Sequence, residues 1–393
     1  MLRLGGSAAL AFTAASQTRV LGAADRVRLG LIGCGGRGRS VMEAFQKNPS
    51  VDVTALCDVY AARIDQAMQA APRAKGFSDH RKLLDSRDVD AVLVATPDHW
   101  HFGVVIDAAR AGKDIYVEKP LTLKLEEGPE IVKEVRLHER VCQVGMQQRS
   151  ARHYLRAKQE YFDTGRLGKV TLARTWWHGN GAHLRKAPPE LQAKPSNLDW
   201  ARYLGPLKWR EYDPPQYFNF RAYLDFGGGQ ITDLFTHWID AVHMLMEQDD
   251  PVSAVSAGGI YHYKDGRTAP DTINTLLEYR GEWTATFEAT LAPGMSGSGI
   301  EIIGTEGRLM IDRGKYEFHP PGRDATPTIV AAEGDMTVDH VNNFLECVMT
   351  RKRPNGDVWI GHRSAQASHL GNIAYLEKRR LKFDPDREVI LPL

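Results

Sequence analysis

The stretch Leu29–Gly38, LGLIGCGGRG, decides the fold of the N-terminal half. It runs from apolar residues into glycines with the spacing G-x-G-x-x-G. Such glycines let the chain turn tightly from a strand into a helix and let the backbone approach a pyrophosphate. The free N–H groups at the start of the helix then favour the phosphate charge. The stretch predicts a dinucleotide-binding unit whose cofactor contacts are Gly33, Gly35, Gly36, Arg37 and Gly38.

A carboxylate follows this motif at the end of the second apolar run. Asp58 stands twenty residues past Gly38, after VDVTALC. A carboxylate there accepts hydrogen bonds from the adenosine ribose and repels a 2′-phosphate. NAD is therefore the expected cofactor, whereas Arg37, Arg39 and Arg63 are the residues that would suit NADP.

Short β-branched runs alternate with helical stretches from Val27 to about residue 150. This alternation is typical of an α/β Rossmann domain, a doubly wound parallel sheet, here expected over residues 25–150. Residues 151–393 differ. They contain a Pro- and aromatic-rich segment, a helix from about Gln230 to Met246, hairpin-spaced strands and closing helices over 337–378. They predict an α+β domain with a large, mostly antiparallel open sheet.

The first 24 residues resemble an export signal, with Arg3 followed by small and apolar residues from Leu4 to Ala15. That apolar run is too short for a membrane span, so no integral membrane segment is predicted. We expect a periplasmic or otherwise exported protein, addressed by a twin-arginine-type signal that is truncated at this start. The alternative is a disordered extension, with the protein remaining in the cytoplasm.

The overall charge is nearly balanced, which excludes one class of partner. Fifty Lys and Arg residues face 49 Asp and Glu residues, a net charge of +1 over 393 residues. Because nucleic-acid binding needs a basic surface, no nucleic-acid partner is expected. A neutral substrate such as a sugar is compatible with this balance. The four cysteines form no C-x-x-C pair, and the histidines show no metal-binding spacing, so no metal site is predicted.

Two later predicted strands are followed by polar and ionisable residues, in the stretches ATPDHWH (95–101) and VEKP (117–120). Ligands of open parallel sheets bind at the carboxyl ends of the strands, so these residues face the nicotinamide end of the cofactor. The predicted cofactor contacts here are Thr96, Pro97, His101, Glu118 and Lys119. Lys119 is also predicted to contact the substrate and to act as the catalytic ammonium. A solvated strand-end pair is the alternative for Glu118 and Lys119.

The helix beginning GGGQITDLFTHWIDAVHML places Asp233, His237 and Asp240 opposite an apolar stripe. A carboxylate and an imidazole four residues apart are within reach of each other. Such a pair would fix the His tautomer and raise the His pKa towards neutrality. We therefore predict Asp233 and His237 as catalytic and substrate-binding residues. The alternative is that these polar residues form the solvent-exposed face of a surface helix.

Aromatic residues are concentrated between 176 and 209, where Trp176, Trp177, Trp200 and Trp209 occur with His178. Aromatic faces beside hydrogen-bonding side chains suit a sugar ring. Trp176 and His178 are therefore predicted to bind substrate. The alternative is an irregular segment held by aromatic anchors, or an oligomer contact.

Together, LGLIGCGGRG, the Asp58 strand end, ATPDHWH, VEKP and GGGxxxDxxxHxxD resemble the glucose–fructose oxidoreductase, inositol dehydrogenase and rhizopine-catabolism family (Gfo/Idh/MocA). The resemblance runs from about Val27 to the C-terminus. It implies an NAD(P)-dependent oxidoreductase in which Lys119, Asp233 and His237 act around the substrate carbinol. It also implies a homodimer or homotetramer formed through the C-terminal sheet. The aromatic insertion and the leader resemble an exported subgroup acting on glycosides.

The expected reaction is hydride transfer between nicotinamide and a hydroxyl-bearing carbon of a sugar, glycoside or polyol. In this hypothesis His237 takes the hydroxyl proton, Asp233 orients His237, and Lys119 stabilises the developing alkoxide. One alternative is a redox-assisted glycosidase that oxidises the sugar transiently, eliminates the aglycone and re-reduces the product. Another is a non-catalytic sugar or dinucleotide sensor.

Overall fold

The computed structural model describes residues 26–179, 184–322 and 325–392. The predicted export segment, residues 1–24, lies outside the described residues. Within the described part, no helix is both long enough and apolar enough to cross a membrane.

The N-terminal half contains a six-stranded parallel sheet in the order β3-β2-β1-β4-β5-β6. Its strands are β1 (Val27–Ile32), β2 (Val51–Cys57), β3 (Lys75–Phe77), β4 (Ala91–Val94), β5 (Asp114–Val117) and β6 (Cys142–Val144). The central strands are buried along nearly their whole length, as expected of apolar runs covered on both faces. The predicted doubly wound sheet is confirmed.

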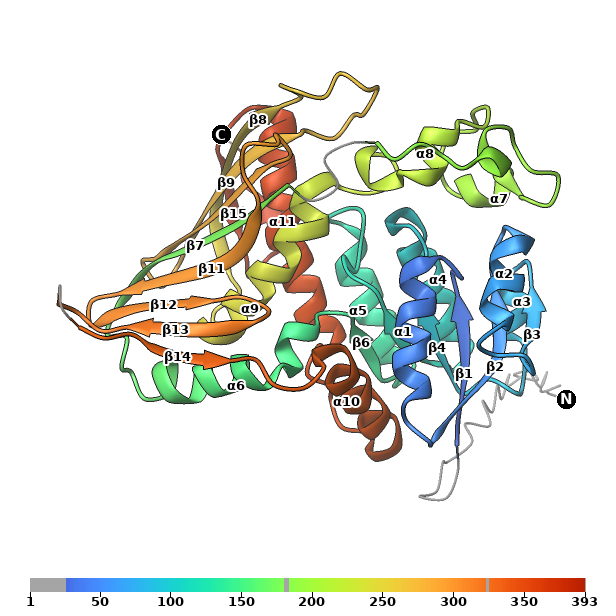
Figure 1. Cartoon of the computed structure of the whole chain (residues 1–393), viewed down its shortest axis with the longest axis horizontal. Helices are drawn as coiled ribbons and strands as arrows, with labels where there is room; N and C mark the ends of the chain where they lie inside the picture. Colours follow the sequence, from blue (N-terminus) through green and yellow to red (C-terminus); the bar gives the residue numbers. More distant parts are fainter. Residues whose placement is uncertain (1–25, 180–183, 323–324, 393) are drawn as a thin grey trace, which may run out of the picture.

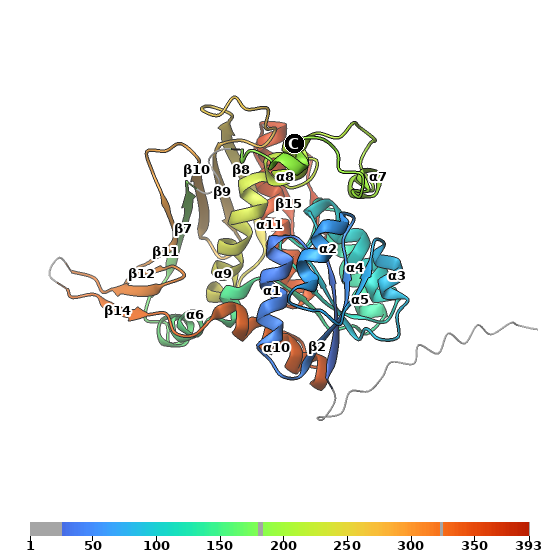
Figure 2. The ribbon, with the colours of Figure 1, turned by 45° about the vertical axis from the view of Figure 1, so that its right-hand side comes forward.

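Helices cover both faces of this sheet (Figure 2). One face carries α1 (Gly36–Gln46), α2 (Ala61–Met68) and α10 (Met336–Thr350). The other carries α3 (His80–Leu84), α4 (His101–Arg110) and α5 (Glu127–Leu137). The late helix α10 contributes Val341, Phe344 and Leu345 to the same core as β1, so this segment returns from the C-terminal half to complete the N-terminal one.

The second sheet has ten strands and lies beside the first unit (Figure 1). Its order is β14-β13-β12-β11-β7-β10-β9-β8-β15-β16, and only the β7–β10 pair is parallel. The strands are β7 (Val170–His178), β8 (Pro251–Gly259), β9 (Thr272–Tyr279), β10 (Thr284–Thr290), β11 (Gly297–Gly304), β12 (Gly307–Ile311), β13 (Lys315–His319), β14 (Thr328–Ala331), β15 (Leu381–Asp384) and β16 (Val389–Ile390). The predicted mostly antiparallel sheet is confirmed.

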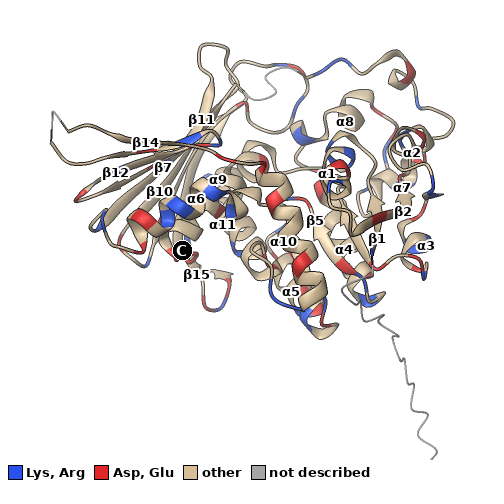
Figure 3. Ribbon diagram, turned by 60° about the horizontal axis from the view of Figure 1, so that its bottom comes forward, with Lys and Arg blue, Asp and Glu red and all other residues tan. Residues whose placement is uncertain are grey.

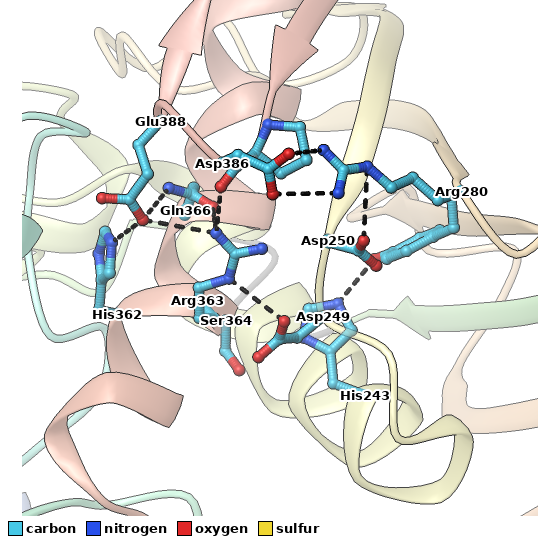
Figure 4. Close-up of polar contacts among 12 residues, drawn as sticks. His243, Asp249, Asp250, Arg280, His362, Arg363, Ser364, Gln366, Asp386 and Glu388 are labelled. Atoms are coloured by element: carbon cyan, nitrogen blue, oxygen red, sulfur yellow. Dashed lines mark hydrogen bonds and ion pairs between the residues drawn. The ribbon is translucent and has the colours of Figure 1, made fainter.

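Three helices pack against one face of this sheet: α6 (Arg152–Ala157), α9 (Thr236–Met246) and α11 (Val358–Glu377). Helix α11 is buried although many of its residues are polar, because their side chains find partners. Figure 4 shows this at its start, where His362 Nε2 lies 2.7 Å from Glu388 Oε1 and Arg363 donates to Gln366 Oε1 at 2.8 Å. Arg280 pairs with Asp386 nearby at 2.6 Å. These contacts fasten the C-terminal hairpin to the domain.

The Pro- and aromatic-rich segment 184–226 lies over the strand ends of the N-terminal sheet and carries α7 (Trp200–Leu204) and α8 (Pro214–Phe218) (Figure 1). Tyr203 O accepts hydrogen bonds from His99 and Trp100, both at 2.8 Å. Trp200 is buried in an aromatic cluster with Tyr203, while Trp209 is 63% exposed. For Trp200 the structure therefore favours the aromatic-anchor interpretation over a sugar contact.

The predicted helix from Gln230 to Met246 consists of two parts. A π-helical turn spans Ile231–Phe235, and the regular helix α9 begins at Thr236. The wider turn changes where side chains before Thr236 point relative to those after it. This irregularity lies at the predicted catalytic residues.

Candidate active site

The glycines of LGLIGCGGRG are needed by the backbone. Gly33 has φ +96, and a Cβ there would come within 2.6 Å of the Ala95 carbonyl group. A Cβ on Gly38 would come within 2.0 Å of Gly33 O. Around Gly36, the first residue of α1, a Cβ would meet nothing within 4 Å. The turn is therefore tight on its inner side and open where a phosphate would approach the helix start.

A pocket beside this turn is lined by predicted cofactor residues, among them Gly33, Gly35, Asp58, Thr96 and Pro97. The two oxygens of Asp58 accept hydrogen bonds from the Cys34 and Tyr60 N–H groups, each at 2.9 Å. The Thr96 hydroxyl is buried, with no hydrogen-bond partner among the described residues. The residues present thus fit a dinucleotide, with open backbone amides, a carboxylate and an unsatisfied hydroxyl in one pocket.

His101 has a different role from the predicted cofactor contact. It lines neither this pocket nor the larger cavity described below. Its Nδ1 lies 2.6 Å from Pro120 O and its Nε2 lies 3.0 Å from Thr96 O. Burial lowers the pKa of His101. The imidazole joins the two strand-end loops to each other, which corrects the prediction.

A cavity of about 640 Å³ lies between the two sheets and contains the predicted catalytic residues. Lys119 reaches it from the end of β5, Asp233 from the π-helical turn and His237 from the first turn of α9. Arg37 and Glu118 line the same cavity and pair at 2.8 Å. Arg37 belongs to the dinucleotide motif, so the cavity is adjacent to the predicted cofactor site.

Lys119 and Asp233 form the central contact of the cavity. Lys119 Nζ lies 2.5 Å from Asp233 Oδ1 and 2.7 Å from Asp233 O. Arg221 Nε donates to the same Oδ1 at 3.1 Å. Burial acts to raise the pKa of Asp233, but Lys119 and Arg221 lower it to about 2. Asp233 is therefore a permanent carboxylate shared by two cations.

His237 does not pair with Asp233, which corrects the prediction. Neither ring nitrogen has a hydrogen-bond partner among the described residues, and Nδ1 is enclosed. Burial, then the positive charges of Lys119 and Arg313, lower the pKa of His237 well below its usual value. The predicted upward shift is therefore wrong. Lys119 and Arg221 hold Asp233, and they leave His237 a neutral imidazole at pH 7.

Asp240 is also placed differently from its predicted polar cluster. It is fully buried and does not line the cavity. Arg149 Nε donates to Asp240 Oδ1 at 2.7 Å, and Ser364 Oγ donates to the same oxygen at 2.9 Å. Burial raises the pKa of Asp240 while Arg149 opposes that rise. Asp240 joins helix α9 to its neighbours.

The face of β7 that meets the cavity carries Trp177. Trp176 and His178 lie on the opposite face, because successive strand residues alternate. Trp176 there contacts Arg174, whose guanidinium carbon is 5.5 Å from the ring centroid. Trp177 lines the cavity and lies 6.1 Å, centroid to centroid, from His237. Of these three residues only Trp177 lines the cavity, which corrects the prediction of Trp176 and His178 as substrate contacts.

The sequence interpretation missed three residues around the cavity. Arg221 and Arg313 line it, and Asp98 lies behind it. Burial raises the pKa of Asp98 to about 7, against the opposing charges of Arg221 and Lys119. Asp98 belongs to ATPDHWH and could have been proposed from that stretch. Arg221 lies in a short 3-10 helix and Arg313 in a hairpin turn, and neither belongs to a recognised motif.

No cluster of three or more His, Cys, Asp or Glu residues suited to a metal ion occurs among the described residues.

Two family models match this chain. A model described as an oxidoreductase family with an NAD-binding Rossmann fold matches residues 27–146. A model of the Gfo/Idh/MocA C-terminal domain matches residues 202–310, so the two matches together cover more than half of the chain. The chain belongs to the Gfo/Idh/MocA family of oxidoreductases. Its Rossmann half is the NAD-binding domain of that family.

Relatives within the family show which proteins this chain resembles. It is 26% identical over 324 residues to scyllo-inositol 2-dehydrogenase (NAD(+)) of Bacillus subtilis, covering 78% of this chain and 81% of that protein. It is 36% identical over 115 residues to α-N-acetylgalactosaminidase of Shewanella oneidensis, a match that spans 25% of that protein. A levoglucosan dehydrogenase solved with NADH and levoglucosan superposes with a TM-score of 0.74 at 18% identity, covering 94% of this chain and 100% of that chain.

Proposed function

We propose that this protein transfers a hydride between nicotinamide and a hydroxyl-bearing carbon of a sugar, glycoside or polyol. The observation that carries the proposal is the meeting of Lys119, Asp233 and His237 in one cavity beside the dinucleotide motif. The similarity to an inositol dehydrogenase over most of both chains supports the same substrate class.

NAD is the proposed cofactor in preference to NADP. Gly33, Gly35, Gly36 and Gly38 would hold its pyrophosphate, and Asp58 would accept from its ribose hydroxyls. Bound nicotinamide supplies the hydride acceptor for alcohol oxidation. The negative charge of Asp58 disfavours a 2′-phosphate, which supports NAD.

Side chains that line the cavity would accept the hydroxyl proton of the substrate and stabilise the charge that develops on its oxygen. His237 is neutral and its ring has no protein hydrogen bond among the described residues, so it is free to take the hydroxyl proton. The Lys119 ammonium would stabilise the negative charge that develops on the substrate oxygen. Asp233 fixes the position of Lys119 through two contacts. This replaces the sequence-based role of Asp233 as the partner of His237.

The proposed reaction is tested by identifying the nucleotide and then the product. The purified protein is denatured and any released nicotinamide is identified. Native protein with NAD is then screened against polyols and glycosides for NADH and for keto products. Binding of NAD with formation of a keto product supports the proposal. A protein that binds NAD and turns over none of these compounds would be a sensor, and the proposal would fail.

A redox-assisted glycosidase is the second candidate function. The partial similarity to an α-N-acetylgalactosaminidase favours it, although that match covers a quarter of the relative. Such an enzyme releases aglycone from a nitrophenyl glycoside without accumulating NADH. A dehydrogenase accumulates NADH or a keto glycoside and releases no aglycone beyond the uncatalysed rate.

A further inference from the structure

The cavity carries far more positive charge than the chain as a whole. Basic and acidic residues are distributed over the helices and strands of both halves (Figure 3), and the chain total is only +1. The charged residues of the cavity lining are six cations, Arg37, Lys119, Arg185, Arg221, Arg267 and Arg313, and two carboxylates, Glu118 and Asp233. The imbalance is therefore local to the cavity.

Pairing does not remove this excess. Arg37 pairs with Glu118 at 2.8 Å, and Arg267 pairs with Asp265 at 2.5 Å. Lys119 and Arg221 have to share one carboxylate, that of Asp233.

A third acid behind the cavity adds only part of a charge. Burial raises the pKa of Asp98 to about 7, so Asp98, unlike Asp233, is not a permanent carboxylate near neutral pH. The positive charges of Lys119 and Arg221 are therefore only partly neutralised.

Arg313 is the cation whose position is most informative. It lies in the turn between β12 and β13, is exposed, and lines the cavity. Its guanidinium carbon is 4.8 Å from the centroid of Trp177 and 5.9 Å from that of Trp238. Within the described part of the chain, no carboxylate lies within 4.0 Å of it. Arg313 is held by aromatic rings, and its N–H groups have no protein acceptor there.

This position changes what Trp177 offers to a substrate. Because Arg313 covers one face of the indole, that face is not an apolar platform for the C–H face of a sugar. The indole instead places a cation near His237, whose ring is 6.1 Å from that of Trp177. The guanidinium carbon of Arg313 therefore lies within about 11 Å of the His237 ring, so one hexose can reach both side chains.

We infer that Arg313, with Arg221 in the lining of the same cavity, binds a carboxylate carried by the sugar substrate. The substrate class is then a hexuronate or its glycoside. This inference rests on the proposed function and names the substrate class of the same site. The planar guanidinium offers paired N–H donors that match a carboxylate.

A substrate carboxylate would also offset the positive charge around His237. After burial, Lys119, Arg313, Arg37 and Arg221 are the groups that lower the pKa of His237. An anion bound by Arg313 and Arg221 would weaken this effect, so His237 would be a stronger base with an anionic substrate than with a neutral one.

The test compares substrates that differ in charge. Full-length protein with NAD is assayed on both anomers of p-nitrophenyl glucuronide and p-nitrophenyl glucoside, following NADH and p-nitrophenol together. Glucose 6-phosphate and glucose 6-sulfate form the other anionic arms. We expect kcat/KM at least tenfold higher for the glucuronide, with KM for it rising as salt screens the attraction.

Arg313→Met is expected to reduce the preference for glucuronide about tenfold or more, mainly through KM, and Arg313→Lys to restore part of it. The matched control is Arg166→Met, because Arg166 also lies over aromatic rings, at 4.8 Å from Tyr161, but outside the cavity. That control should keep the preference. Thermal unfolding of each variant shows whether it is folded.

Three results would overturn the inference while leaving the proposed function intact. They are equal kcat/KM for glucoside and glucuronide without salt dependence, a preference for the phosphate or sulfate ester, and an Arg313→Met variant that weakens NAD binding and all substrates equally. The last would assign Arg313 to the dinucleotide. Absence of turnover on every substrate, charged or neutral, would instead overturn the proposed function.

Discussion

Lys119 Nζ lies 2.5 Å from Asp233 Oδ1 and 2.7 Å from Asp233 O, across the interface between the two halves of the molecule. Lys119 follows β5 of the Rossmann sheet, and Asp233 belongs to the π-helical turn before α9. The two contacts therefore set the position of the ammonium relative to both the cofactor side and the substrate side of the cavity.

The first prediction removes this ammonium. Lys119→Ala should lower kcat by about 10² or more, because the developing oxygen charge loses the stabilising Lys119 ammonium, while NAD still binds. The control is Lys169→Ala, whose exposed side chain pairs with Glu282 at 2.7 Å outside the cavity. Steady-state kinetics and dinucleotide titration measure both effects. If the variant's kcat stays within a factor of three of the wild-type value, Lys119 does not take part in catalysis.

The pH dependence of activity follows from His237. Because burial and neighbouring cations lower the pKa of His237 well below 6.5, its neutral form prevails throughout the neutral range. We expect His237 to contribute no acidic limb to kcat/KM between pH 8 and 6.5, where any change would instead report Asp98, whose pKa burial raises to about 7. His237→Gln should lower kcat by about 10² or more.

The exposed His262 provides the control for that profile, as His262→Gln should not alter it. An acidic limb with a midpoint above 6.5 that disappears in His237→Gln would contradict the expectation, because it would mean that His237 titrates normally.

The sequence predicted the fold because its decisive signals are local. LGLIGCGGRG and the apolar runs after it need only neighbouring residues to form a strand, a turn and a helix. The site depends on partners far apart in the chain. Lys119 and Arg221 come from 114 and 12 residues before Asp233, and no helical spacing could reveal that they hold the carboxylate away from His237.

The two tryptophans of β7 show a second limit of sequence interpretation. Alternation along a strand tells which residues share a face, but WWH carries large side chains on both faces, so the pattern does not say which face is inside. The net charge of the chain likewise does not predict the charge of the cavity, since +1 over the whole chain coexists with a strongly cationic cavity.

Trp176 and Trp177, on opposite faces of β7, allow a matched pair of variants. Trp177→Leu should raise the substrate KM by about five- to tenfold, because Arg313 loses a cation–π contact of roughly 1 kcal/mol and its fixed position. Trp176→Leu removes the same side chain on the opposite face and should leave KM within twofold. Equal effects from the two variants would contradict the assigned face.

Cofactor choice should depend on Asp58. Wild-type protein should bind NAD at least about tenfold more tightly than NADP, since the carboxylate repels a 2′-phosphate. Asp58→Ser should narrow that ratio, whereas Asp65→Ser, on the exposed side of α2, should not. Fluorescence titration with both nucleotides measures the ratio. Tighter binding of NADP by wild type would overturn the choice of NAD.

Asp240 should contribute to stability and not to catalysis. It is fully buried, and Arg149, only 11% exposed, donates to it at 2.7 Å. Asp240→Asn leaves the Arg149 charge without its counter-ion, which typically costs about 3–5 kcal/mol. We expect a lower unfolding midpoint with kcat within twofold of wild type. Asp240→Leu combined with Arg149→Met should recover much of the loss, because an apolar pair needs no counter-ion. An Asp240→Asn variant that unfolds like wild type but loses turnover would place Asp240 in the chemistry instead.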